Sequence, residues 1–170
     1  GVAISTRFYL PSTSAAPSIS PTYISDWEDT SIGARLITST EKSSSSLSST
    51  EFSDGSDVDR DILFRQYVSG AIDTITITNP TIKFQIQGSE NSANGNMFTS
   101  LYVSVVQSDG TLRGVILAVT RDNVELPNGP PKTNRQFTAT PTVTVNAVSG
   151  DRIVIEIGTG HGGFLEVLRS

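Results

Sequence analysis

The stretch "RIVIEIGTGHGG", residues 152–163, decides the fold class. Its first half places an isoleucine at every second position: Ile153, Ile155 and Ile157. A period of two is typical of a strand that buries one face. Its second half spaces Gly158, Gly160 and Gly163 as G-x-G-x-x-G, which marks a dinucleotide-binding turn when the strand belongs to a parallel α/β sheet. The rest of the chain must therefore show whether helices alternate with strands.

The period of two recurs along the whole chain, and no segment requires a long helix. Nine segments with alternating, mostly β-branched apolar residues are predicted to be strands: 2–10, 34–39, 61–69, 74–78, 81–87, 101–106, 115–119, 142–148 and 152–157. Alternation also predicts which side chains share a face within a strand. In 61–69 the predicted set is Ile62, Phe64 and Val68, and in 115–119 it is Val115, Leu117 and Val119.

Turn signals separate these segments. Asp-Gly in 108–110 and Ser-Gly-Asp within 148–152 predict short hairpins. Residues 89–97 and 126–134 predict longer polar loops. Many short strands joined in this way predict an all-β fold, an antiparallel, jelly-roll-like β-sandwich of about nine strands.

The length of 170 residues fits one domain, 1–170. Residues 11–26 are rich in Pro, Ser and Ala, and we expect them to run extended over the surface. Residues 41–59 are rich in serine, and we expect an exposed loop there.

In this context the glycine motif does not predict a nucleotide site. A dinucleotide-binding turn opens a long helix, and an acidic residue follows about 20 positions later. Neither feature follows Gly163 in this sequence. We therefore expect the glycines to form a flexible turn that lets residues 164–170 fold back.

Composition excludes several function classes. The chain has 17 acidic and 12 basic residues, a formal charge of −5 and no basic run, which argues against nucleic acid or membrane surfaces as partners. It has no cysteine, so thiolate catalysis and disulfides are excluded. His161 is the single histidine and no G-x-S-x-G elbow is present, so we predict no enzyme, no catalytic residue and no cofactor.

Two further candidates have alternative interpretations. The acidic stretch from Asp54 to Asp61 lacks the EF-hand glycine and glutamate; we favour a solvated loop over a calcium site and predict no metal. Trp27, the single tryptophan, is either a buried anchor, which we favour, or an exposed platform for a sugar ring.

Three segments resemble a known group of proteins. They are "TRFYLPSTSAAPSISPTYISDWEDT" (6–30), "LFRQYVSGAI" (63–72) and "SGDRIVIEIG" (149–158). The residues of the first segment that carry the resemblance are Arg7, Tyr9, Leu10, Pro11, Trp27, Asp29 and Thr30. The chain is similar to small β-sandwich virion proteins of tailed bacteriophages, although those continue with a further polar strand where this sequence has "HGGFLEVLRS".

The resemblance implies a non-enzymatic virion structural protein made in the host cytoplasm. We favour a capsid decoration (cement) protein bound to the major capsid protein over a tail or baseplate component. The rival hypothesis is a carbohydrate-binding β-sandwich module. Apolar residues near both ends are predicted to contact partners in a homo-oligomer, with a trimer favoured: Val2, Ile4, Phe164, Leu165, Val167 and Leu168.

Overall fold

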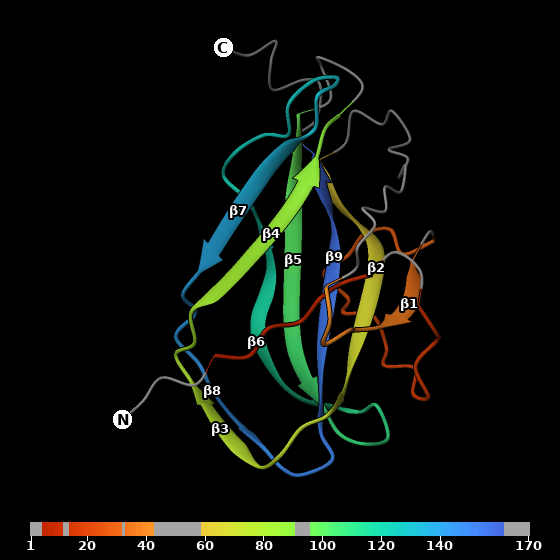
Figure 1. Ribbon diagram of the computed structural model, residues 1–170, viewed down its shortest axis with the longest axis vertical. Helices are drawn as coiled ribbons and strands as arrows, with labels where there is room; N and C mark the ends of the chain where they lie inside the picture. Colours follow the sequence, from red (N-terminus) through yellow and green to blue (C-terminus); the bar gives the residue numbers. More distant parts are fainter. Residues whose placement is uncertain (1–4, 12–13, 32, 43–58, 91–95, 162–170) are drawn as a thin grey trace.

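The computed structural model describes residues 5–11, 14–31, 33–42, 59–90 and 96–161 (Figure 1). These residues form nine strands and no helix, so the prediction of an all-β protein with about nine strands is confirmed. The strands are β1 (Ala34–Ile37), β2 (Arg60–Ala71), β3 (Ile75–Thr78), β4 (Ile82–Gly88), β5 (Met97–Val106), β6 (Leu112–Arg121), β7 (Thr133–Ala139), β8 (Thr144–Ala147) and β9 (Arg152–His161). Their pairings are antiparallel except that of β1 with β2. Within these ranges no helix is long and apolar enough to cross a membrane.

Strand β9 lies at the centre of a five-stranded sheet whose order is β1-β2-β9-β5-β6. Both neighbours run antiparallel to β9, and Ile155 is in register with Tyr67 of β2 and with Val103 of β5. Because side chains alternate along a strand, Ile155 and its two neighbouring isoleucines point to one face. We call this the front face of the sheet and the opposite one the back face.

The other four strands form a two-stranded ribbon in two parts, β3 with β8 and β4 with β7. Where the parts meet, the Asn79 N–H donates to the Val143 carbonyl at 2.8 Å, and the Asn79 side-chain oxygen accepts from the Val143 N–H at 3.0 Å. Asn79 has a φ of 43°, a left-handed conformation that asparagine tolerates better than most residues. The ribbon therefore continues past a kink, and Figure 1 shows it lying across the five-stranded sheet.

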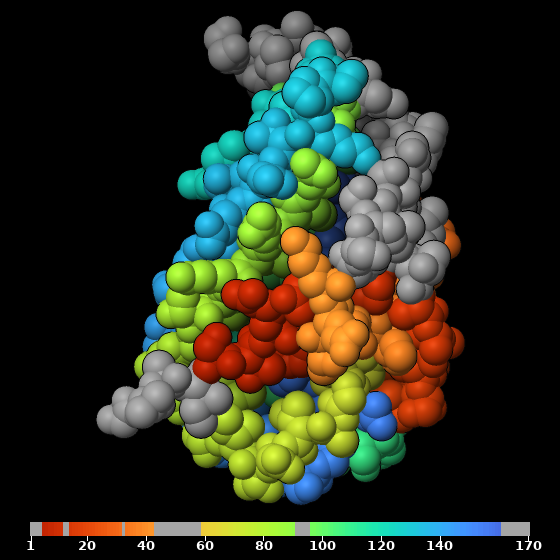
Figure 2. Space-filling model, viewed as in Figure 1, coloured from red at the N-terminus to blue at the C-terminus, as the bar shows by residue number. Residues whose placement is uncertain are grey.

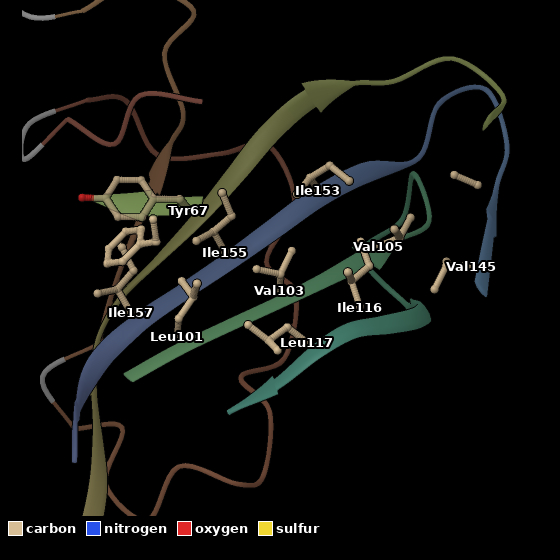
Figure 3. Packing of buried hydrophobic residues seen from close by; sticks show 12 residues of the cluster. Tyr67, Leu101, Val103, Val105, Ile116, Leu117, Val145, Ile153, Ile155 and Ile157 are labelled. Carbon is tan, nitrogen blue, oxygen red and sulfur yellow. The ribbon is translucent and has the colours of Figure 1, made fainter. Parts of the chain in front are cut away.

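Apolar side chains fill the space between the ribbon and the front face, and we call this cluster the front core (Figure 3). The two central strands contribute every second residue: Leu101, Val103, Val105, Ile153, Ile155 and Ile157. The ribbon contributes Phe84, Val145 and Ala147. The alternation predicted for these segments is thus confirmed.

Residues 14–31, which we call the strap, cover the back face. The Ala15 carbonyl accepts a hydrogen bond from the Ile37 N–H at 3.1 Å, so the strap begins beside edge strand β1. Further along, Ile19 packs against one apolar cluster of the back face, and Trp27 belongs to another. Both faces of the central strands are therefore covered by protein.

The described part of the predicted strand 2–10 is not a strand. Only Tyr9 forms a β-bridge, with Ser39. Phe8 and Leu10 pack against the front core from this segment. The alternating pattern here reflects two buried side chains rather than pairing in a sheet.

A β-bulge in β2 overturns the prediction that Ile62, Phe64 and Val68 share a face. The register of β2 against β9 shifts between Leu63 and Arg65, so Phe64 is an extra residue. Ile62 therefore faces the front and Val68 faces the back. Sequence periodicity cannot show such an insertion, because it assumes an unbroken period of two.

A second irregularity, in β6, overturns the predicted common face of Val115, Leu117 and Val119. The register of β6 against β5 shifts between Leu117 and Val115. Ile116 and Leu117 both lie in the front core, whereas Val115 and Val119 pack against the back-face cluster of Trp27.

Two connections also differ from prediction. No strand was predicted at β7, and its first two residues were assigned to the loop 126–134. The pattern was weak because the core-facing positions of β7 include only one large apolar residue, Phe137, beside Arg135. The turn within 148–152 is not a hairpin, because it joins β8 of the ribbon to β9 of the sheet. Its Gly150 has a φ of 96°, and the Gly150 N–H donates to the Ile72 carbonyl at 3.0 Å.

Candidate functional site

The centre of the back face holds a carboxylate, Glu156, which is 0% exposed. Its Oε1 accepts hydrogen bonds from the Ile24 N–H at 3.1 Å and from the indole Nε1 of Trp27 at 2.9 Å. Its Oε2 accepts from Nε2 of Gln66 at 2.8 Å. Since Ile24 and Trp27 belong to the strap, one carboxylate of β9 binds the strap to the middle of the sheet.

Gln66 of β2 extends this arrangement and is also 0% exposed. Its Oε1 accepts from Nε of Arg35 at 2.9 Å, and its Nε2 donates to the Pro21 carbonyl at 3.1 Å as well as to Glu156. The Arg35 guanidinium lies 4.2 Å from the ring centroid of Tyr23. Arg35 therefore fixes the amide of Gln66 with its nitrogen towards Glu156. We call Glu156, Gln66, Arg35 and their strap partners the Glu156 network.

Burial raises the pKa of Glu156 above its ordinary value, although hydrogen bonds from Gln66, Ile24 and Trp27 act in the opposite direction. Burial also raises the pKa of the nearby Tyr102 hydroxyl. A perturbed carboxylate is found both in active sites and in structural networks. Here the carboxylate accepts from three donors of the chain itself, two in the strap and one in β2, which is the arrangement of a structural network.

Trp27 is 4% exposed, so the prediction that it is a buried anchor is confirmed. Its ring packs with Leu63 and Tyr102, while its Nε1 donates to Glu156. A buried indole with its N–H satisfied cannot serve as a stacking platform for a sugar. The carbohydrate-binding hypothesis therefore loses the residue on which it was based.

The two described glycines of the motif lie in a strand and not in a turn, so the turn predicted for them is wrong. Gly158 and Gly160 are part of β9 and face the back. A Cβ on Gly158 would lie 1.9 Å from the Ile62 carbonyl oxygen and 2.7 Å from the Trp27 ring. A Cβ on Gly160 would lie 1.9 Å from Nε of Arg121. Each glycine thus makes room for a side chain of the back face, while Gly163 lies outside the described residues.

That neighbour of Gly160 belongs to a second polar cluster. Nε of Arg121 contacts Oδ1 of Asp61 at 2.9 Å, and its Nη2 contacts Asp59 at 2.6 Å. Ser100 also donates to Asp61 at 2.9 Å. Of the acidic stretch proposed as a loop, Asp59 and Asp61 are therefore paired with an arginine, and Asp54 lies outside the described residues.

A groove of about 470 Å³ opens between the end of β6 and strand β7, lined by residues 120–123 and 135–139. At its base Arg135 donates from Nε and Nη2 to both oxygens of Asp122, at 2.5 and 2.7 Å. The Asp122 side chain is 1% exposed. Arg135 Nη2 also donates to Oδ1 of Asn123 at 3.2 Å.

Two more carboxylates are buried near the ends of the sheet. Asp151, in the turn before β9, accepts two hydrogen bonds from Arg113. Burial tends to raise its pKa, but Arg113 and the Val148 N–H leave that pKa lowered. Burial raises the pKa of Glu90, and the neighbouring Glu125 adds to the rise.

Several predicted site residues cannot be placed. All six predicted partner-binding residues lie outside the described ranges: Val2, Ile4, Phe164, Leu165, Val167 and Leu168. The backbone of His161 ends β9, and its side chain is outside the described part. Among the described residues, no group of three or more His, Cys, Asp and Glu could hold a metal ion.

The sequence contained one unused signal for the Glu156 network. In β9 the positions that alternate with the isoleucines hold Val154, Glu156 and Gly158, and a valine with a glycine is unusual on a face expected to meet water. These residues indicate that both faces of the strand are covered. A carboxylate between them is then expected to be buried and paired.

These buried polar groups bind one part of the chain to another. The carboxylates of Glu156, Asp61 and Asp151 each accept hydrogen bonds from side chains of other segments. Comparisons of the chain with protein-family models, with curated proteins and with solved structures find no match.

Proposed function

We propose that the protein is a non-enzymatic structural protein of a bacteriophage virion, a capsid decoration protein that binds the major capsid protein lattice. The observation that carries the proposal concerns the residues of the resemblance, which occupy positions that hold the chain together. Tyr9 bridges Ser39, the Pro11 carbonyl accepts from the Tyr67 hydroxyl at 2.9 Å, and Trp27 donates to Glu156.

Asp29 fits the same pattern. Its carbonyl accepts from the Leu63 N–H at 2.9 Å, and its side chain accepts from the Ser31 N–H at 2.8 Å. A motif of such residues specifies how the strap lies on the sheet and supplies no reacting group. This supports a structural role over catalysis.

The proposal includes a finer description of the fold. The ribbon and the five-stranded sheet would be the two layers of a β-sandwich, since apolar side chains of both meet in the front core. The six apolar residues near the ends, 2, 4, 164, 165, 167 and 168, would contact neighbouring chains in a homo-oligomer, for which we favour a trimer.

Electron microscopy of purified particles tests the location. A chain labelled at its C-terminus is expected on the capsid lattice in many symmetric copies. A label confined to the tail would favour the alternative of a tail or baseplate component. Absence of the chain from the particles would contradict both.

A truncation tests the proposed contacts. Deletion of 164–170 is expected to weaken self-association, measured by light scattering, and binding to particles, while the β spectrum stays unchanged. Unfolding of the truncated chain would show that these residues belong to the core and would contradict the assembly argument. A monomeric intact protein that binds no particle would contradict the proposal as a whole.

A further inference from the structure

We propose that the groove between β6 and β7 binds residues 164–168 of a second copy of this chain as an added β-strand. The inference rests on the proposed contact of these residues with neighbouring chains, and it names the surface that receives them. The groove offers the two features that a docking strand needs, which are a free main-chain edge and an apolar floor.

The lining of the groove shows that it follows the edge of a strand. It includes five consecutive residues of β7, 135–139, and four consecutive residues at the end of β6, 120–123. Successive side chains of a strand point to opposite faces, so Gln136 points outwards whereas Phe137 points to the core. Both kinds of residue can border one groove only along the strand edge, where the main chain is exposed.

The edge of β7 that borders the groove is free for pairing. On its other edge all seven residues of β7 pair with β4 in unbroken register, and Figure 2 shows β7, in blue, at the surface beside β4. Apart from that pairing, no hydrogen bond joins the main chain of 135–139 to another described residue. Towards β6 the link is made by side chains, because Arg135 donates to Asp122. A regular strand edge with unpaired N–H and C=O groups is a template for another strand.

The floor of the groove is apolar. Phe137 and Ala139 are half-buried and pack against the front core. A strand added to β7 places every second side chain beside them and therefore needs apolar residues with that spacing. Leu165 and Val167 have this spacing in the C-terminal segment, and Glu166 between them would face outwards into water.

Length and reach identify a second copy as the donor. The apolar segment 164–168 has as many residues as the stretch of β7 along the groove. Strand β9 ends at His161, and the groove lies beyond both β5 and β6, roughly 14 Å away at about 4.8 Å per strand. The three residue steps from 161 to 164 span at most roughly 11 Å. The same chain thus cannot place the whole segment beside β7, whereas a neighbouring chain can. Such a head-to-tail contact can close into a ring, as in the favoured trimer.

Disulfide trapping tests the site in the full chain, which has no cysteine of its own. Two single variants, Gln136→Cys and Glu166→Cys, would be mixed, oxidised and analysed by mass spectrometry. A disulfide that joins the two variants forms only between chains, and docking would hold both thiols at a high effective concentration. We expect about tenfold or more of this mixed product compared with a control mixture.

The control mixture contains Asn146→Cys in place of Gln136→Cys. Asn146 is exposed on the same outer side of the ribbon, in β8, and lies outside the groove. Both variants should keep the β spectrum of the parent chain, because the replaced side chains are exposed. Equal yields from the two mixtures would overturn the groove assignment, and self-association measured by light scattering would then leave the proposed assembly standing. A monomeric chain would overturn both.

Two further results would overturn the choice of occupant. If the Gln136→Cys homodimer predominates in the mixture, two β7 edges meet and no C-terminal segment lies between them. The double variant Gln136→Cys, Glu166→Cys tests the chain's own segment. If it closes a disulfide within one chain while the mixture yields no excess of the mixed product, the second copy is not the donor.

Discussion

The two faces of the five-stranded sheet are buried in different ways. The front core is made of apolar, mostly aliphatic side chains from β5, β6, β9 and the ribbon, together with Tyr67 of β2. The back face also contains apolar clusters, but its centre is polar: Glu156 and Gln66 are both 0% exposed. The front is covered by strands and the back by an irregular strap, whose main chain needs hydrogen-bond partners that a purely aliphatic surface would not supply.

This difference determines what each face tolerates. A front position is defined by volume and shape, so another aliphatic side chain of similar size can replace it. A back position is defined by which atoms donate and which accept, because a buried polar group without a partner is costly. Isosteric changes should therefore have little effect on the front face and a large effect on the back face.

The largest effect is expected for Gly158→Ala. Its Cβ would collide with the Ile62 carbonyl oxygen at 1.9 Å, and a backbone atom cannot move aside by changing rotamer. We expect the free energy of unfolding to fall by about 4 kcal/mol or more, with loss of the buried Trp27 fluorescence signal. The matched control is Gly70→Ala, since no atom lies within 4 Å of its added Cβ. Equal stability of the two variants would contradict the close packing of the strap.

On the front face, Leu101→Ala is expected to lower the free energy of unfolding by about 3 kcal/mol, because Leu101 is 1% exposed and a cavity would remain. Leu101→Met preserves the volume and should lower it by less than about 1.5 kcal/mol. Denaturant unfolding measures both. If the methionine variant were as unstable as the alanine variant, the front face would not be governed by volume.

On the back face, Glu156→Gln preserves shape but is expected to lower the free energy of unfolding by about 2 kcal/mol. The new amide nitrogen would face Nε2 of Gln66, so that two donors meet. Turning the amide of Gln66 would only move the conflict to Nε of Arg35. The exposed Glu41→Gln is the matched control and should change little.

A second substitution makes this test sharper. Gln66→Glu, added to Glu156→Gln, places an acceptor towards position 156 and another towards Arg35. The double variant should recover part of the lost stability, because the new carboxylate would also face the Pro21 carbonyl, which accepts from Gln66 in the parent chain. The loss of stability in the double variant is compared with the sum of the losses in Gln66→Glu alone and Glu156→Gln alone. If the two are equal, the side chains do not act through a shared hydrogen bond.

The contrast between the faces also explains what sequence can predict. The front core follows from alternation, and Ile153, Ile155 and Ile157 lie where their period places them. The bulges at Phe64 and beside Ile116 depend on the register of neighbouring strands, which no single segment contains.

The Glu156 network was not predicted because it joins positions far apart in the chain. Trp27 and Glu156 are 129 residues apart, and Gln66 and Glu156 are 90 apart. A glycine pattern and a carboxylate in β9 acquire their meaning only when the strap is placed over them. The sequence shows that Trp27 is suited to burial, but not which acceptor its N–H will meet.

The smallest expected effect is the dependence of the free energy of unfolding on pH. This dependence distinguishes the back face from the front face, because the front core contains no carboxylate. The pKa of Glu156 is raised by burial above 4.5, so the folded chain binds this proton more tightly than the unfolded chain. Its contribution is therefore favourable near pH 4.5 and is lost as pH rises through the raised pKa; the raised pKa of Glu90 acts in the same direction. The pKa of Asp151 is lowered below 3.8, so its stabilising contribution is present above that pH and is lost on further acidification.

These signs predict that acidification from neutral pH first increases the free energy of unfolding towards pH 4.5 and then decreases it below about pH 3.8. Urea unfolding at a series of pH values measures the curve. Glu156→Gln should flatten its upper part, leaving the smaller slope due to Glu90, whereas Glu41→Gln should leave the curve unchanged. A Glu156→Gln variant with the full slope would mean that the buried carboxylate does not change its protonation between the folded and unfolded chain. In that case the hydrogen bonds from Trp27, Ile24 and Gln66 would offset the cost of burial, and the back face would resemble the front in its response to pH.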